Sequence, residues 1–175
     1  MDPEIELKRI CDEHQGIFKH EATKVNGAEG STIHISKYHL ILPYRQHPIT
    51  IVYDYGNSDT ATFRIHLKQH SNQVKFKIKT IDHLSRFLQF KKHRYAVSCS
   101  NSILKNSIKA CVIKHQLDDL FENTAFELHS TGQHKNDMYE IYSVFSLKYS
   151  SHAESAADLL NFHKALIDLV LDKTP

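Results

Sequence analysis

The chain has 175 residues, of which 41% are hydrophobic and 24% are charged, and its formal net charge at pH 7 is +2. This length suffices for one domain with a core of its own, and the composition excludes an intrinsically disordered protein. No CxxC spacing links the three cysteines (Cys11, Cys99 and Cys111), which argues against a disulfide framework and a cysteine zinc site. No apolar run approaches the ~20 residues of a membrane helix, and no signal-peptide pattern follows the acidic start, so we expect a soluble, cytoplasmic protein.

The N-terminal segment predicts a helix over about residues 3–15. Asp2 is a good N-cap and Pro3 suits the first helical position. Apolar residues then recur at helical spacing until Gly16, where the pattern ends.

The middle of the chain predicts antiparallel strands, because apolar and polar residues alternate there. The pattern begins at Ile33 and Ile35, passes the Pro43–Pro48 turn and continues over 49–55. After the turn at 56–59 it runs over 61–68 and, beyond a polar loop, over 74–79. We expect a meander of at least four strands, in which 61–68 and 74–79 pair as a hairpin.

The second half of the chain predicts further helices and one more hairpin. A short helix carrying Leu84, Phe87 and Leu88 precedes a strand at 95–100, and a helix over 101–122 is broken near Gln116. The segments "TAFELHS" and "MYEIYSVFSLKY" predict the last hairpin. Ser151 and Glu154 form a capping box that opens an amphipathic helix over 151–172.

The predicted fold class is therefore α+β, as a single domain over 1–175. An antiparallel meandering sheet is joined by an N-terminal helix, mid-chain helices and the C-terminal helix, whose apolar stripe packs on the sheet. A homodimer through the 151–172 helix is the alternative use of that stripe.

Positive charge is concentrated in one part of the chain. Residues 61–95 contain nine Lys or Arg and one acid, Asp82, which amounts to +8, whereas the remaining residues sum to −6. If 61–68 and 74–79 form a hairpin, their basic residues share the face opposite the apolar one. Like charges directly across strands are destabilising, so something should offset them.

This segregation favours a non-enzymatic binding or adaptor domain that uses the basic face within 61–95. An acidic protein is the favoured partner, and nucleic acid or an anionic membrane surface is the other candidate. Phe63 and Phe76 fall on the apolar side, which argues against stacking of bases on this face. The alternative without a partner is that acids of the same chain, such as Asp118, Asp119 or Glu122, cover the basic face within 61–95. The candidate contact residues are Arg64, Lys68, Lys75, Lys77, Lys79, Lys91, Lys92 and Arg94.

Fourteen histidines raise the question of a metal site. Three of them (His34, His39 and His47) lie within 31–48, but no HxH pair occurs and no carboxylate lies between His34 and His47. His66 and His70 have helical i, i+4 spacing but fall in a strand and a turn. The spacing therefore predicts surface histidines, with no metal and no cofactor.

Cys99 is the strongest candidate nucleophile, because it lies where a strand ends and a helix begins, and a helix N-terminus stabilises a thiolate. The alternation of Tyr95, Val97 and Cys99 instead indicates a core residue. Phosphate-binding and hydrolase motifs are absent from the sequence, so we predict no catalytic residue. An enzyme with an unsignalled site near Cys99 is the alternative to a binding domain.

Overall fold

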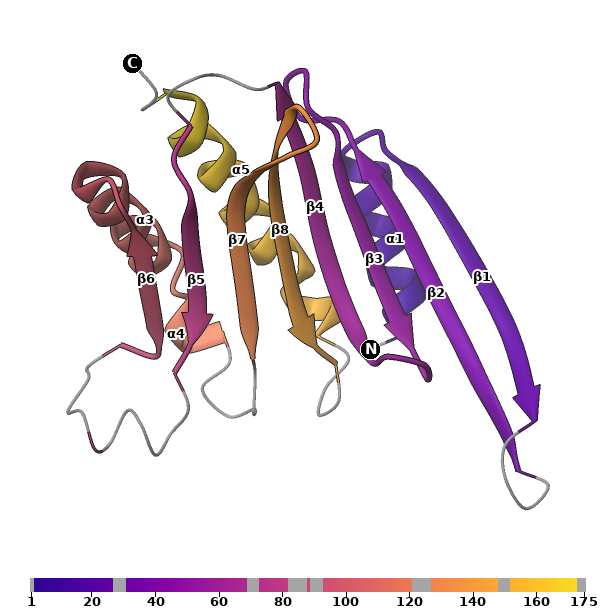
Figure 1. Cartoon of the computed structure of the whole chain (residues 1–175). Helices are drawn as coiled ribbons and strands as arrows, with labels where there is room; N and C mark the ends of the chain where they lie inside the picture. Colours follow the sequence, from indigo (N-terminus) through magenta and orange to yellow (C-terminus); the bar gives the residue numbers. More distant parts are fainter. Residues whose placement is uncertain are drawn as a thin grey trace.

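A computed structural model describes residues 2–26, 31–68, 73–81, 88, 93–120, 127–147 and 152–172 (Figure 1). Eight strands form one sheet in the order β1-β2-β3-β4-β8-β7-β5-β6, and all neighbours are antiparallel. The predicted α+β class with an antiparallel sheet is confirmed. The strands are β1 (Ile17–Asn26), β2 (Thr32–Leu42), β3 (Ile49–Tyr55), β4 (Thr60–Lys68), β5 (Phe76–Thr80), β6 (Tyr95–Cys99), β7 (Leu128–Lys135) and β8 (Met138–Ser146).

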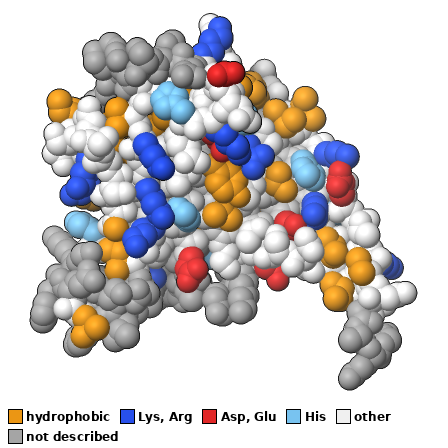
Figure 2. Space-filling view, in the orientation of Figure 1, with side chains coloured by type: hydrophobic (Ala, Val, Ile, Leu, Met, Phe, Trp, Pro, Cys, Tyr) orange, Lys and Arg blue, Asp and Glu red, His pale blue; other side chains and the backbone are white. Residues whose placement is uncertain are grey.

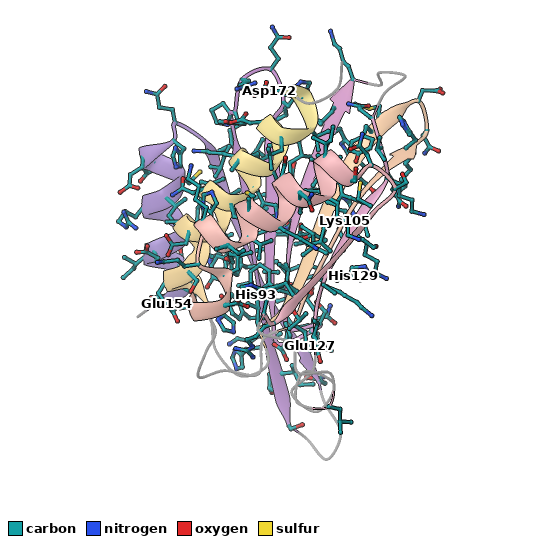
Figure 3. The ribbon with its side chains drawn as sticks, turned by 90° about the vertical axis from the view of Figure 1, so that its left-hand side faces the viewer. His93, Lys105, Glu127, His129, Glu154 and Asp172 are labelled. Carbon is teal, nitrogen blue, oxygen red and sulfur yellow. The ribbon has the colours of Figure 1, made fainter. Side chains whose placement is uncertain are left out.

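The helices lie together on one face of the sheet (Figures 1 and 3). They are α1 (Pro3–Glu13), α3 (Ser102–Lys114), α4 (Leu117–Leu120), the 3-10 turn η2 (Ala153–Ser155) and α5 (Ala156–Asp172). Asp2 caps α1 as predicted, because its side chain accepts a hydrogen bond from the Glu4 amide at 2.9 Å. The predicted break at Gln116 is also confirmed, and that residue has a φ of 49° between α3 and α4. None of the described helices is long and apolar enough to cross a membrane.

The core lies between the sheet and the helix layer. Alternate residues of β4 are buried (Ala61, Phe63, Ile65 and Leu67). The apolar stripe of α5 packs against the same side of the sheet, and its buried side chains are Ala156, Leu159, Leu160, Phe162, His163, Leu166, Ile167 and Val170. The stripe that a homodimer would need is thus used within the chain.

The predicted pairing of 61–68 with 74–79 is wrong. The meander is correct only for β1–β4, because β8 and β7 lie between β4 and β5. Alternation predicts which face a residue takes, but it does not specify which strand lies alongside. The intervening pair of strands keeps the basic side chains of β4 and β5 from lying directly opposite one another, which removes much of the expected repulsion.

Two details of the first strands also differ from expectation. Strand β1 has no clear alternation and is exposed along most of its length, so its sequence carries no strand signal. It nevertheless pairs with β2 from Ile17 opposite Ile41 to Asn26 opposite Thr32. Ile33 is expected on the buried side but is 44% exposed. Tyr38, Leu40 and Leu42 are the residues of β2 that face the core, so Ile33, an odd number of positions away from each, points to the opposite side of the sheet.

Some predicted features lie outside the described residues. These are the helix residues Leu84 and Phe87, the cations Lys91 and Lys92, and Ser151 of the capping box. The C-terminal helical segment is described from η2 onward, and α5 continues it to Asp172.

Candidate binding surface

The face of the sheet away from the helices carries no described helix, and we call it the open face (Figures 2 and 3). His129 lies on this side of the sheet in Figure 3, opposite Glu154 of the helix layer. Successive residues of a strand point to opposite sides of the sheet. The neighbours of each buried residue along its strand therefore lie on the open face. On β4, Arg64, His66 and Lys68 are therefore exposed and alternate with the buried residues Ile65 and Leu67.

Cations concentrate on the half of the open face formed by β4, β8, β7 and β5. Figure 2 shows Lys and Arg side chains in two groups there, one over β5 and one over the middle of the sheet. We call this half the basic surface. Its positively charged or titratable members are Arg64, His66 and Lys68 of β4, Lys77 and Lys79 of β5, and His129 and Lys135 of β7.

Glu140 of β8 is the one carboxylate that the described strands place within the basic surface. Its side chain is 6% exposed and contacts two cations and a histidine. Nε of Arg64 and Nε2 of His66 lie 3.4 and 3.3 Å from Oε1, and Nζ of Lys135 lies 3.4 Å from Oε2. One carboxylate thus orients Arg64 and Lys135 but cannot neutralise both, so the surface keeps an excess of positive charge.

Arg64 is positioned by a second contact. Its guanidinium lies 5.1 Å from the centre of the Tyr142 ring, the neighbour directly across on β8. This cation–π contact and the Glu140 ion pair orient the guanidinium over β8. An oriented guanidinium loses less conformational entropy when it binds a carboxylate than a free one does.

The other half of the open face, formed by β1, β2 and β3, is balanced in charge. Lys19 pairs with Glu21 at 2.6 Å and Lys37 pairs with Asp54 at 3.2 Å. Burial alone would raise the pKa of Asp54, but hydrogen bonds from Asn57 and Lys37 outweigh it and lower that pKa. The excess of cations is therefore a property of the basic surface and not of the whole face.

The predicted contact residues divide into three groups. Arg64, Lys68, Lys75, Lys77 and Lys79 are exposed as expected, although Lys75 precedes β5 and is not part of a strand. Arg94 is 6% exposed and lies before β6, so it does not belong to the basic surface. Lys91 and Lys92 lie outside the described residues.

Asp118, one of the acids expected to cover the patch, lies elsewhere. Its Oδ2 is 3.1 Å from Nδ1 of His93, and its Oδ1 accepts a hydrogen bond from the Arg94 amide at 2.9 Å. These contacts join α4 to the segment before β6. Asp118 therefore does not cover the cations of β4 and β5, and the Asp119 side chain and Glu122 lie outside the described part of the chain.

Four residues of the basic surface were missed by the sequence reasoning, namely His129, Lys135, Glu140 and Tyr142. They belong to β7 and β8, which are far from β4 in sequence and enter the surface only through strand order. Burial lowers the pKa of His129, and the nearby cations Lys77 and Lys79 lower it further. His129 therefore stays neutral beside two lysines at neutral pH.

The histidines of the opening β-hairpins do not gather into a metal site. His39 lies on the open face with Nε2 at 3.7 Å from Glu21, and His34 is exposed on the opposite side of β2. Across the described residues, no group of three or more His, Cys, Asp or Glu side chains could hold a metal ion.

Cys99 ends β6 opposite Phe76 and is partly buried against the core, as its alternation predicts. The nearby helix N-terminus is occupied by another group, because the Asn101 side chain accepts a hydrogen bond from the Leu104 amide at 2.9 Å. This cap leaves one fewer free amide with which α3 could stabilise a thiolate.

A serine–histidine pair occurs inside the core. Oγ of Ser143 lies 2.8 Å from Nε2 of His163, and all three of Ser130, Ser143 and His163 are 0% exposed. A nucleophile and base at this distance would need access for a substrate, which full burial denies. The arrangement therefore satisfies buried polar groups instead of building a catalytic site.

Comparison of the chain with protein-family models, with curated proteins and with solved structures gives no match.

Proposed function

We propose that this protein is a non-enzymatic binding domain whose basic surface docks an acidic segment of a partner protein. The observation that carries the proposal is the excess of exposed cations on β4, β5 and β7 around Glu140, the one carboxylate that the described strands place among them. Complementary charge of this kind raises association rates and selects partners of opposite sign.

An acidic protein fits this surface better than a single-stranded nucleic acid. Single-strand binders use exposed aromatic rings on which bases stack. Phe63 and Phe76 are 0% and 1% exposed on the helix side of the sheet. Tyr142 is the one Phe or Tyr that the described strands place on the basic surface, and the Arg64 guanidinium lies over its ring.

Binding to defined probes tests the proposal. We would measure affinities of the full chain for a fluorescein-labelled glutamate-rich peptide, a single-stranded DNA oligonucleotide and phosphatidylserine-containing vesicles, each at several salt concentrations. We expect the peptide to bind with an affinity that falls as salt rises, because exposed charge pairs are screened. Equal or tighter binding of DNA or vesicles would overturn the choice of partner, and no binding of any probe at low salt would overturn the function.

A charge-reversal pair supplies the structural control. Lys77→Glu with Lys79→Glu should weaken peptide binding by about tenfold or more, because like charges then face the probe. Lys24→Glu with Lys109→Glu makes the same change in net charge at exposed residues on β1 and α3, away from the basic surface. Equal losses in the two variants would show a nonspecific charge effect and contradict the proposed site.

A further inference from the structure

Strand β1 forms one edge of the sheet, and no described strand pairs with its outer side (Figure 1). All ten of its residues pair with β2, from Ile17 opposite Ile41 to Asn26 opposite Thr32, and no bulge interrupts this register. Alternate residues of an edge strand direct their N–H and C=O groups away from the sheet, where a further strand can pair with them. Natural sheets protect such edges with short strands, bulges, prolines or lysines, and β1 has only the lysines.

Four large apolar side chains on the open face of β1 and β2 are exposed. Ile17 is 66% exposed, Val25 and Ile33 are each 44% exposed, and Ile41 is 41% exposed. They form two cross-strand pairs, Ile17 with Ile41 at one end of β1 and Val25 with Ile33 at the other. In Figure 2, hydrophobic side chains lie near both ends of this strand pair. Each end of β1 therefore presents an apolar pair beside an unpaired strand edge.

A second copy of β1 fits this edge in a register that symmetry restricts. Two antiparallel copies are related by a two-fold axis perpendicular to the sheet, which opposes the residue on the axis to itself. An axis at Glu21 opposes Ile17 to Val25 of the second copy. Ile41, Ile17, and Val25 and Ile33 of the second copy then form one apolar row across four strands. The axis repeats this row at the other end of β1.

Neighbouring registers do not join the apolar pairs. With the axis at His20, Ile17 would face Thr23 of the second copy. With the axis at Ala22, Val25 would face Lys19 of the second copy. The exposed apolar residues thus select the axis at Glu21, which also pairs β1 along nearly its whole length, over 17–25.

The lysines of β1 do not oppose this register. Lys19 lies opposite Thr23 of the second copy, and Lys24 lies opposite Phe18 of the second copy. No cation of β1 faces another, so the charges that protect an edge from other strands do not repel this one. Lys24 also gains the ring of Phe18 as a neighbour, which suits an ammonium group.

Glu21 is the one residue that meets a like charge, because it lies on the axis. In each copy its carboxylate pairs with Lys19 at 2.6 Å, and Lys37 lies directly opposite it on β2. The hydrogen bond from Lys19 lowers the pKa of Glu21, and the charges of Lys19, His39 and Lys37 lower it further. Two carboxylates on the axis would therefore be surrounded by cations, which offsets their repulsion.

We propose that two copies of this chain join through their β1 strands, antiparallel and with Glu21 on the two-fold axis, so that their sheets become one continuous sheet. The axis is perpendicular to the sheet, so the basic surfaces of both copies face the same side. The proposal uses a different surface from the proposed function and does not depend on it. The apolar stripe of α5, buried within each copy, takes no part.

Sedimentation equilibrium of the full chain tests for this dimer. We expect the mass to rise from that of one chain to that of two as the concentration increases. Ile17→Lys should raise the dissociation constant by about tenfold or more, because the axis places the substitution in both apolar rows. Ile103→Lys makes the same change on α3 at a residue that is 68% exposed, and it should leave the constant unchanged. Unfolding curves of both variants verify that the monomer is folded.

Cysteine cross-linking tests the register. Each variant carries Cys99→Ser, which removes the one native cysteine that is not buried. Oxidised glutathione should link Glu21→Cys into covalent dimers, because directly opposite Cα atoms lie about 4.5–5.5 Å apart, within the range of a disulfide. Thr23→Cys should stay monomeric, since its two copies would lie about 14 Å apart. A mixture of Thr23→Cys and Lys19→Cys should link.

Three results would overturn the proposal. The mass of one chain at every concentration up to the solubility limit would exclude the dimer. A dimer that Ile17→Lys and Ile103→Lys affect equally would not use β1. Covalent dimers that form as readily from Thr23→Cys as from Glu21→Cys would contradict the axis at Glu21.

Discussion

Oγ of Ser143 lies 2.8 Å from Nε2 of His163, and this buried contact fixes the direction of a hydrogen-bond chain. Nδ1 of His163 is 2.6 Å from the Leu159 carbonyl, an acceptor, so Nδ1 carries the proton and Nε2 accepts from Ser143. Ser143 has then used its only proton, and Ser130, 2.6 Å away, donates to it. The Phe63 ring stacks on the imidazole at 4.3 Å, so a neutral His163 serves as both a core ring and a hydrogen-bond centre.

The hydrogen-bond chain through His163 predicts that the folded protein loses stability in mild acid. Burial lowers the pKa of His163 to about 4, whereas the unfolded chain has the ordinary value of 6.5. As the pH falls from 6.5 toward 4 the unfolded state binds a proton that the folded state excludes, so stability is full above pH 6.5 and is lost through this window. The contribution amounts to about 2 kcal/mol between pH 7.5 and 5.

Urea denaturation at the two pH values measures this effect. Burial also lowers the pKa of His14, His115, His129 and His152, so the wild-type change contains their contributions as well. His163→Gln removes only the titration of the core residue and keeps an amide able to hydrogen-bond. We expect its change in unfolding free energy to be smaller by about 2 kcal/mol. An unchanged difference between the two pH values would show that His163 does not titrate in this way.

Glu140→Gln should separate stability from binding. The substitution removes the carboxylate shared by Arg64, His66 and Lys135, whose side chains are about half exposed. Screening by solvent limits the cost in unfolding free energy to about 1 kcal/mol. Because Arg64 and Lys135 lose their internal partner, affinity for the glutamate-rich peptide should rise about threefold.

Glu127→Gln is the matched control for that prediction. It removes the same charge from an exposed residue one position before β7, outside the Glu140 contacts. Its unfolding free energy should stay within about 0.5 kcal/mol of the wild type. Weaker peptide binding by Glu140→Gln would mean that this carboxylate orients the cations more than it competes with the ligand.

Gly132→Ala tests the strand order on which the basic surface depends. Gly132 lies on the helix side of β7 opposite Phe76, and an added Cβ would lie 2.1 Å from a Phe76 ring carbon and 2.3 Å from the Tyr139 hydroxyl. Both rings are buried, so the variant should lose about 2 kcal/mol or more of unfolding free energy. Thr131→Ala, one residue along on the open face, should lose less than about 1 kcal/mol. Equal effects would contradict the pairing of β5 with β7.

The three cysteines should differ in their rates of modification. Cys11 and Cys111 are 0% and 7% exposed, and burial raises the pKa of both thiols, that of Cys111 to about 11. Cys99 is more exposed than either. A disulfide reagent should therefore modify one thiol quickly in the folded protein and three in urea. Loss of the fast phase in Cys99→Ser identifies the residue, and an alkylation midpoint below pH 7 would instead support an activated thiolate and the enzyme alternative.

The local pattern of the sequence was sufficient to predict which residues of a strand or helix face the core. Alternation along 61–68 assigned Phe63 and Ile65 to the core and Arg64 and Lys68 to the surface, and helical spacing assigned Leu159 and His163 to the buried stripe of α5. These assignments depend on the periods of strand and helix, which a linear sequence displays directly.

Strand order and the basic surface were decided by the tertiary structure. Lys77 and Arg64 share one row only because β7 and β8, about 60 residues or more beyond β4, insert between their strands. The insertion brings Glu140 beneath the cations and Tyr142 beneath Arg64, and neither contact has a signal near residues 61–79. Several strands have similar alternation, so the sequence does not show which of them pair. Pairing between distant strands is decided by the packing of the whole core. The sequence by itself thus determined that a face of this sheet would be basic, and the tertiary structure decided which strands form that face and placed Glu140 among its cations.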